Sequence, residues 1–151
     1  MRRERFRGWT LIELLLVTGV LALLSLAASA GWQNVRLRQH RLAAVQALVA
    51  AEAAQGRWRA SRAAWATHWG EGGLGLPLAS ADGRWAFTID DTDTPGQGVR
   101  LRALAQGPQR EDGACRELAL LLSPQGSEPR SGPDARLAND AAANRRCWGL
   151  P

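Results

Sequence analysis

One uninterrupted apolar stretch near the N-terminus, residues 9–30, constrains the fold of this 151-residue chain more than any other feature. As an α-helix, a stretch of this length extends about 33 Å, close to the roughly 30 Å hydrocarbon thickness of a bilayer. Glu13 is its only charged residue, and a charge inside a membrane span costs about 2.5–3.5 kcal/mol on insertion scales. The stretch therefore predicts a membrane-spanning helix whose glutamate has a specific role.

The charges that flank the apolar stretch predict its orientation. Residues 1–8 contain four arginines and one glutamate, and basic residues beside a hydrophobic segment stay in the cytoplasm. This short head supplies +3 of the formal net charge of +5, since residues 9–151 hold 15 arginines against 13 acids. We therefore expect a cytoplasmic N-terminus and a body on the other side of the membrane, and the overall charge is a weak indication of nucleic-acid binding.

Two simple interpretations of the N-terminus leave part of it unexplained. A plain membrane anchor needs no carboxylate near its start. A secretory signal peptide would account for the basic head, the apolar stretch and the small residues 28–31, ASAG, as a cleavage site. However, the stretch exceeds the usual length of roughly 7–15 residues and contains an acid, and the residues after Gly31 continue a helical pattern.

A short motif at the start of the apolar stretch accounts for the glutamate. The glycine that ends the basic head is followed by WTLIELLLV, residues 9–17. This sequence resembles the type IV prepilin signature, in which a dedicated cytoplasm-facing peptidase cuts after the glycine. The matching residues are Gly8, Thr10, Leu11, Ile12, Glu13 and Leu14. Trp9 departs from the phenylalanine that is commonest at its position.

The resemblance implies a processing and assembly pathway. Cleavage after Gly8 would free the α-amine of Trp9, which family members usually methylate. Glu13 of an incoming subunit would then pair with the amine of its neighbour in the fibre, and such an ion pair sets register. Thr10 and Glu13 also fit a helix capping box, a local role that needs no partner. The implied partners are prepilin peptidase, other pilin subunits and inner-membrane assembly proteins.

The resemblance also implies a domain organisation. Residues 1–8 would be the leader, residues 9–31 the hydrophobic half of a long helix, and residues 32–151 the periplasmic globular domain. The subunit would be a single-pass inner-membrane protein before it enters an extracellular or periplasmic fibre. In minor pilins an aromatic residue after the helix begins a loop that ends in a Leu-Pro element, and here Trp65 and residues 74–77, LGLP, could correspond.

Residues 32–55 extend the helical pattern beyond the apolar stretch. They contain no proline or glycine and are rich in alanine, so we expect one helix from about residue 9 to about residue 59. Because of the tryptophans that follow, it should end between Gly56 and Trp65. Aliphatic residues at spacings of seven, three and four predict the helix face that packs on the globular domain. These residues are Val35, Leu42, Val45 and Val49.

The remainder of the chain predicts an antiparallel sheet. Residues 84–90 and 99–105 alternate apolar and polar side chains, which is typical of half-buried strands. Residues 115–123 alternate less cleanly, and we interpret them as a third strand, with a short helix as the alternative. Residues 123–146 are rich in Ser, Pro, Gly, Asn and Arg and are expected to be irregular. The fold class is therefore α+β, a long N-terminal helix packed on a small antiparallel sheet.

The chain has two cysteines, both far beyond the apolar stretch. A pair that follows a membrane signal favours a disulfide in an oxidising compartment. A bond between Cys115 and Cys147 would close a C-terminal loop, an arrangement that is common in pilins. A metal site is excluded because two distant cysteines and two histidines lack zinc spacing.

No pattern in the sequence indicates enzyme chemistry. His40 lies among helical arginines, and His68 lies in a tryptophan-rich loop. The acidic residues 90–93 lack the glycine and the terminal glutamate of a calcium loop. We therefore predict no catalytic, cofactor-binding or metal-binding residues and interpret the chain as a structural subunit, a minor pilin of a type IV pilus used for adhesion and twitching motility.

Two alternatives remain open at this point. One is a pseudopilin of type II secretion, which the N-terminal motif cannot separate from a pilin. The other is a DNA-binding uptake pilin, with arginines on phosphates and Trp148 stacked on bases. Against it, residues 116–146 hold five arginines and four acids, which is nearly balanced. The arginines considered for phosphate contacts are Arg100, Arg102, Arg116, Arg130, Arg136, Arg145 and Arg146.

Overall fold

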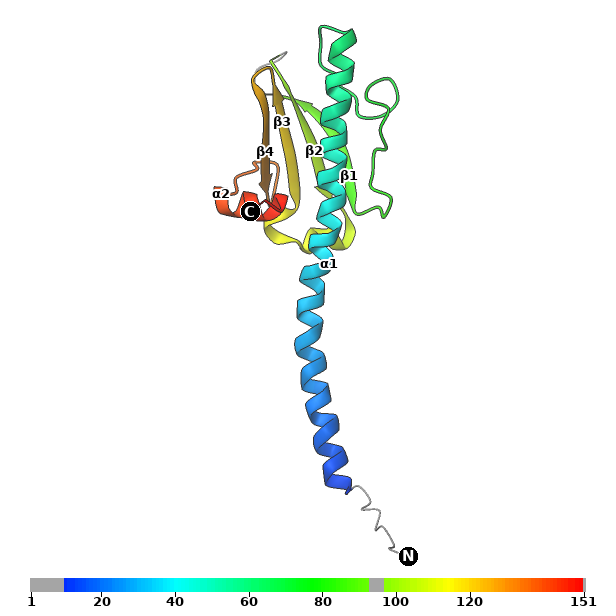
Figure 1. Cartoon of the computed structure of the whole chain (residues 1–151), viewed down its shortest axis with the longest axis vertical. Coiled ribbons are helices and arrows are strands. Elements are labelled where there is room, and N and C mark those ends of the chain that lie inside the picture. The colour runs from blue at the N-terminus through cyan, green and yellow to red at the C-terminus, as the bar shows by residue number, and fades with distance from the viewer. Residues whose placement is uncertain (1–9, 93–96, 151) are drawn as a thin grey trace, which may run out of the picture. The chain divides into compact units, whose positions relative to one another are not determined.

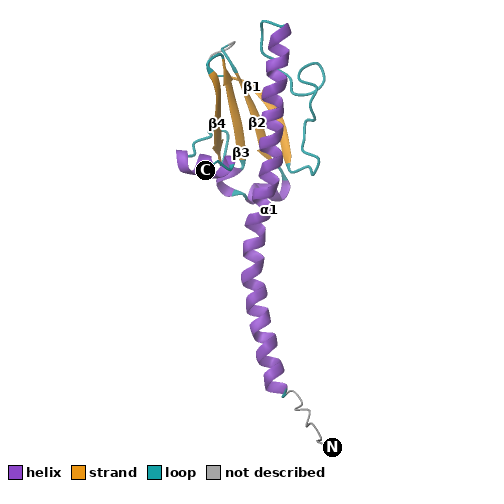
Figure 2. Ribbon diagram, in the orientation of Figure 1, coloured by secondary structure: helices purple, strands orange, loops and turns teal. Residues whose placement is uncertain are grey.

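The structure is a computed structural model that describes residues 10–92 and 97–150, apart from the side chains of residues 27–30. Its first element is helix α1, Leu11–Ser61. The chain divides into two compact units, Met1–Arg36 and Leu37–Pro151, and α1 contributes to both. Figure 1 shows the order of the elements, and Figure 2 separates helices from strands.

In the first unit, residues 11–36 form the N-terminal half of α1, and Thr10 precedes it. An 18-residue window of this helix has a mean hydropathy of 2.4, so it is long and apolar enough to cross a membrane. Its large aliphatic side chains are exposed, for example Leu11 at 78% and Leu23 at 70%. Apolar surface of this extent requires cover by lipid or by other helices.

The second unit is built on a four-stranded antiparallel sheet in the order β1-β2-β3-β4. The strands are Trp85–Asp91, Val99–Ala105, Glu117–Ser123 and Gly126–Gly132. The three predicted strands are confirmed, and the third is a strand rather than a short helix. The second half of α1 lies across one face of this sheet (Figure 1). Trp85 fastens the two layers, since its Nε1 donates a hydrogen bond of 2.9 Å to the carbonyl oxygen of His40.

The expectation that residues 123–146 are irregular is wrong in two places. Strand β4 pairs with β3 along its whole length, from Glu117↔Gly132 to Ser123↔Gly126. Pro129 is tolerated there because β4 is an edge strand. Helix α2, Ala141–Trp148, begins at Asp140, whose side chain accepts a hydrogen bond from the Ala143 amide, and it ends at Gly149 with φ 67°. These two caps define a helix too short for periodicity to reveal.

The predicted packing face of the long helix is wrong at three of its four residues. Val35, Leu42 and Val49 are 50%, 56% and 52% exposed, whereas Val45 is half-buried and packs against the core. The buried face that meets the sheet consists instead mostly of small and polar residues, with Leu48 as its one fully buried large aliphatic residue and Val45 at its edge. This face consists of Arg41, Ala44, Leu48, Ala51, Ala54 and Gln55, all buried. The reason is volume, because the sheet already supplies bulky side chains, and close packing then selects alanines from the helix.

The core between helix and sheet is aromatic at one edge and aliphatic in the centre. Trp69 and Phe87 stack with their ring centroids 5.1 Å apart, and Leu101 and Leu118 are fully buried. Helix α1 ends at Ser61, between Gly56 and Trp65 as predicted, and Gly56 lies inside it.

Candidate functional site

The first candidate site is the start of α1. Thr10 caps the helix, since its Oγ1 accepts a hydrogen bond of 3.3 Å from the Glu13 amide. Among the described residues, the Glu13 side chain makes no reciprocal bond, so one half of the predicted capping box is present. Its carboxylate is exposed in the first turn. Gly8 and Trp9, the predicted processing residues, lie outside the described residues.

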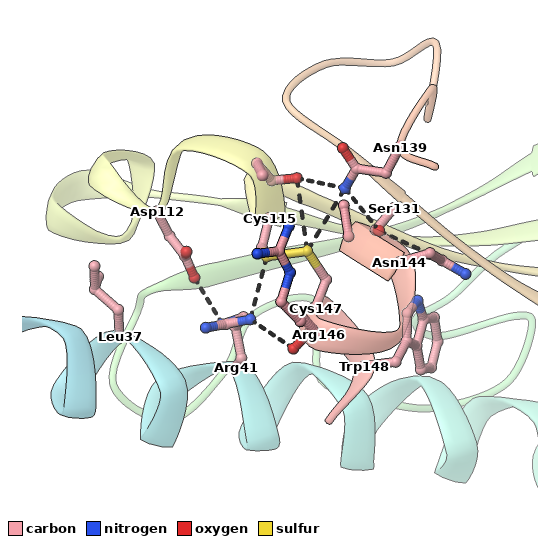
Figure 3. Close-up of a disulfide and its surroundings, with 12 residues drawn as sticks. Leu37, Arg41, Asp112, Cys115, Ser131, Asn139, Asn144, Arg146, Cys147 and Trp148 are labelled. Carbon is pink, nitrogen blue, oxygen red and sulfur yellow. Dashed lines mark hydrogen bonds and ion pairs between the residues drawn. A yellow bond between two sulfur atoms is a disulfide. The ribbon is translucent and has the colours of Figure 1, made fainter. Parts of the chain in front are cut away.

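The predicted disulfide is confirmed, and it closes the C-terminal part of the domain (Figure 3). Cys115 and Cys147 are buried, with their Cα atoms 5.4 Å apart. Asn139 reinforces this closure, because its Nδ2 donates hydrogen bonds of 2.8 Å to the carbonyl oxygen of Ala114 and 2.9 Å to Ser131 Oγ. The disulfide therefore joins α2 to the segment that precedes β3.

Arg41 of α1 reaches this closure from the other layer (Figure 3). Its Nε lies 2.8 Å from Asp112 Oδ2. Its Nη1 lies 3.1 Å from Cys115 Sγ and donates a bond of 3.0 Å to the Arg146 carbonyl. Burial lowers the pKa of Arg41 and raises the pKa of Asp112, and in each case the opposite charge of the partner acts against burial. The pair ties the helix to the disulfide-closed end, and the sequence analysis missed it.

The outer face of the sheet carries several arginines that the sequence analysis considered for DNA. Arg102 is held between Asp90, at 2.5 Å, and Glu117. Burial acts to lower the pKa of Arg102, but its bonds to these carboxylates outweigh burial and raise the pKa above its ordinary value. Arg130 pairs with Glu128 at 2.6 Å. Because carboxylates already neutralise these cations, this face is a poor phosphate-binding surface.

Trp148 does not serve as a stacking platform. It is 7% exposed and belongs to the core, and its Nε1 donates a hydrogen bond of 3.0 Å to the carbonyl oxygen of Arg130. A base could reach this ring only if α2 moved away from β4. The expectation that Trp148 stacks on nucleic acid is therefore wrong.

Exposed arginines gather instead at the disulfide-closed end of the domain. Arg116 follows Cys115, and its Nε donates a bond of 2.7 Å to the Arg110 carbonyl, while two more arginines end α2. In the part of the chain that the structure describes, none of the four has a carboxylate oxygen within 4.0 Å. We call Arg110, Arg116, Arg145 and Arg146 the disulfide-end arginines.

A second basic group lies at the other end of the domain, around the last turn of α1. Residues 53–70 contain three arginines and no acid. Two of the arginines stack on tryptophans, which the sequence analysis interpreted only as core and loop anchors. The acid-free run was the signal that could have indicated this group. Its members are Arg57, Arg59 and Arg62 with Trp58 and Trp65.

A long apolar helix, a four-stranded antiparallel sheet on its second half and a disulfide-closed C-terminal part define a protein of the type IV pilin class. A family model described as "Type IV minor pilin ComP, DNA uptake sequence receptor" matches residues 31–119, and the chain belongs to this family. No curated protein matches the chain with significant similarity.

The family match confirms the resemblance found at the N-terminus from an independent part of the chain, since it begins at residue 31. It includes β1, β2 and Cys115, whereas β4 and α2 lie beyond it. The family is one of structural proteins. As a minor pilin, the chain associates with a membrane and with other pilin subunits.

Proposed function

We propose that the chain is a minor pilin that binds DNA for uptake by a type IV pilus. The observation that carries this proposal is the family match, because the matching family is described as a DNA uptake sequence receptor. The sequence favoured adhesion and twitching motility, with DNA binding as an alternative. The family description reverses that order, and no described feature favours a secretion pseudopilin.

The proposed life cycle of the subunit begins at the inner membrane. Residues 1–8 form a cytoplasmic leader, prepilin peptidase cuts after Gly8, and the new amine of Trp9 is methylated. The apolar half of α1 anchors the subunit with residues 32–151 in the periplasm. Inner-membrane assembly proteins then add it to the fibre, where Glu13 pairs with a neighbour's amine. The exposed aliphatic residues of the first unit support this pathway, because they need cover from lipid and later from other subunits.

The disulfide-end arginines are the proposed contact with DNA. Arg116, Arg145 and Arg146 are exposed, and no described carboxylate neutralises them. Duplex DNA carries one negative charge per about 1.7 Å of axis, and each neutralised phosphate releases counterions. On the outer face of the sheet, by contrast, Arg102 and Arg130 are already paired with carboxylates. The disulfide holds these arginines together, since Cys115 and Cys147 are each adjacent in sequence to one of them.

A gel-shift titration of the full mature chain in detergent tests the function. We expect binding of duplex DNA that weakens steeply between about 50 and 200 mM salt. Chromosomal fragments from the organism that encodes the chain should compete better than unrelated DNA of equal length. The double variant Arg145→Gln/Arg146→Gln should weaken binding, whereas Arg130→Gln, a matched change at an ion-paired arginine, should not. Absence of binding at the lowest salt would contradict the proposal.

A cellular experiment separates DNA uptake from motility. Deletion of the gene should reduce transformation by added DNA and leave twitching intact. Loss of twitching with normal transformation would favour the adhesion and motility function instead. Loss of protein secretion alone would indicate a pseudopilin.

A further inference from the structure

The last turn of α1 and the loop after it combine positive charge with rigid side-chain placement. Arg57, Arg59 and Arg62 are exposed. No carboxylate oxygen lies within 4.0 Å of their guanidinium groups in the described segments, and the one side-chain hydrogen bond among them runs from Arg62 Nη1 to Ser61 Oγ. Three cations within six residues, none of them paired with a described carboxylate, create a positive electrostatic potential that attracts anions.

Two of these arginines are fixed by stacking on tryptophan rings. The guanidinium carbon of Arg59 lies 4.0 Å from the ring centroid of Trp65, and that of Arg62 lies 3.8 Å from the ring centroid of Trp58. Stacking uses the flat face of a guanidinium and leaves its N–H groups, which lie in the plane, for hydrogen bonds. It also restricts two long side chains before any ligand arrives, which lowers the entropy that binding must overcome.

The loop that carries Trp65 is itself anchored by a buried amide. Gln55 of α1 is fully buried. Its Nε2 donates a hydrogen bond of 2.8 Å to the Ala66 carbonyl, and its Oε1 accepts one of 3.0 Å from the Ala66 amide. Both bonding groups of the side chain are thus used on the residue next to Trp65. The indole that supports Arg59 therefore belongs to a segment held rigidly against the helix.

A purely structural explanation covers only part of this arrangement. Cations near a helix C-terminus interact favourably with the macrodipole, and half-buried tryptophans contribute packing. The macrodipole favours any cation and falls off within the last turn, so it does not explain the two stacked pairs. Every basic residue of the chain is an arginine, so the stacked geometry, and not the residue type, is the observation that needs explanation. The planar, bidentate geometry of arginine matters when the ligand is a phosphate or a carboxylate.

We propose that Arg57, Arg59 and Arg62 form a phosphate clamp for duplex DNA, distinct from the disulfide-end arginines. This inference rests on the proposed function of DNA binding. The ligand group is the phosphate backbone rather than the bases, because guanidinium groups already cover one face of each indole. Contacts of this kind hold DNA without reading its sequence.

The clamp lies at the opposite end of the domain from the disulfide. Asp91, at the end of β1, and Val99, at the start of β2, line a hollow together with Trp65. Cys115 instead follows the far end of β2. Strands of seven residues separate the two ends, which is about 20 Å at 3.3 Å per residue. Because of this separation, DNA can contact one group of arginines without contacting the other. Substitutions in the two groups can therefore be tested independently.

Asp91 offers a control for the clamp, because its substitution should change DNA affinity in the direction opposite to the loss of an arginine. It is exposed and is the one described carboxylate that lines the hollow beside Trp65. A negative charge there opposes an approaching phosphate. Asp91→Asn removes that charge without removing any arginine, so it should strengthen DNA binding by about twofold to threefold at low salt, an amount typical of one screened surface charge.

The test compares the full mature chain with the triple variant Arg57→Gln/Arg59→Gln/Arg62→Gln. We expect affinity for duplex DNA to fall about tenfold or more at low salt, equally for preferred and unrelated sequences. The slope of log affinity against log salt should become shallower by about 0.9 per arginine that contacts a phosphate. Arg130→Gln is the matched control, and thermal melting of each variant checks the fold.

The possible outcomes separate the clamp from the proposed function. A folded triple variant whose affinity and salt slope equal those of the wild type overturns the clamp, and so does a loss confined to one DNA sequence. Wild-type chain that binds no DNA overturns the proposed function as well. If the triple variant does not fold, the single variant Arg57→Gln takes its place, because Arg57 is in neither stacked pair. It should make the slope of log affinity against log salt shallower by about 0.9. An unchanged slope in that variant also overturns the clamp.

Discussion

Arg41 and Asp112 form an ion pair of 2.8 Å between the long helix and the segment that precedes the disulfide, with side chains only 11% and 13% exposed. The Arg41 guanidinium also contacts Cys115 Sγ and the carbonyl of Arg146. One buried cation thus connects α1, the disulfide and α2. Because both charges are removed from water, the loss of either partner leaves an uncompensated charge.

The first prediction follows from this pair. Asp112→Asn keeps the shape of the side chain but removes the charge that Arg41 faces. We expect it to lower the free energy of unfolding by about 3–5 kcal/mol in urea denaturation. The double variant Arg41→Met/Asp112→Asn should recover most of that loss, since it removes both charges. Equal stability of Asp112→Asn and the wild type would show that the pair is not a stabilising contact.

A second prediction tests the corrected packing face of α1. Leu48 is fully buried against the sheet, whereas Leu42 is 56% exposed on the same helix. Leu48→Ala should therefore destabilise the domain by about 2–5 kcal/mol. Leu42→Ala, the same substitution on the other face, should change stability by no more than about 0.5 kcal/mol. The reverse order in chemical denaturation would restore the face that the sequence pattern predicted.

These residues also show why part of the fold could be predicted from the sequence and part could not. Alternation of Val99, Leu101 and Ala103 with polar neighbours was enough to locate β2, because one face of it is buried. The helix face was predicted wrongly because a search for large aliphatic residues passes over alanines. Ala44 and Ala51 are buried only because side chains elsewhere in the chain fill the space opposite them.

The missed elements depend on partners that are distant in sequence. β4 has the sequence GSEPRSG, with no alternation of its own, and it forms because β3 offers it a ladder of backbone hydrogen bonds. The Arg41–Asp112 pair and the bonds of Gln55 to Ala66 leave no periodic trace either. By contrast, the motif around Glu13 is a short contiguous sequence, and the disulfide follows from the number and positions of the cysteines. Both could therefore be predicted from the sequence.

A third prediction concerns acid stability. Asp82 accepts hydrogen bonds from Ser80 Oγ at 2.6 Å and from the Arg84 amide at 3.2 Å, and it pairs with His40 at 2.7 Å. Burial acts to raise the pKa of Asp82, but these bonds outweigh it and lower the pKa below its ordinary value of 3.8. The carboxylate therefore contributes stability that is present above that pH and is lost as the pH falls through the folded-state pKa.

In Asp82→Asn this contribution is absent at every pH. The variant should be less stable than the wild type at neutral pH, and the difference should shrink as the pH is lowered below about 4. Urea denaturation at a series of pH values measures it. Asp134→Asn is a control at an exposed aspartate outside the described ion pairs. A difference that grows on acidification would contradict the assignment.

A fourth prediction concerns the disulfide. Cys115 and Cys147 are 32 residues apart in sequence, and on the chain-entropy model a loop of that size contributes on the order of 3–4 kcal/mol. Cys147→Ser should lower the melting temperature under oxidising conditions. Addition of a reductant should destabilise the wild type and leave the variant unchanged. A variant that melts at the wild-type temperature would show that the bond is dispensable for the fold.

The last prediction concerns Glu13, whose exposed carboxylate lies in the first turn of an apolar helix. Thr10 already caps this turn through the Glu13 backbone amide, a bond that survives replacement of the Glu13 side chain. Glu13→Ala should therefore leave membrane insertion and cleavage intact, and sequencing of the mature chain should begin at Trp9. Incorporation into sheared fibres should fall strongly, because the incoming subunit has no charge to pair with a neighbour's amine. Thr18→Ala, which removes an uncharged polar side chain farther along the same helix, is the control and should be incorporated normally. Normal incorporation of Glu13→Ala would leave the glutamate without an assembly role.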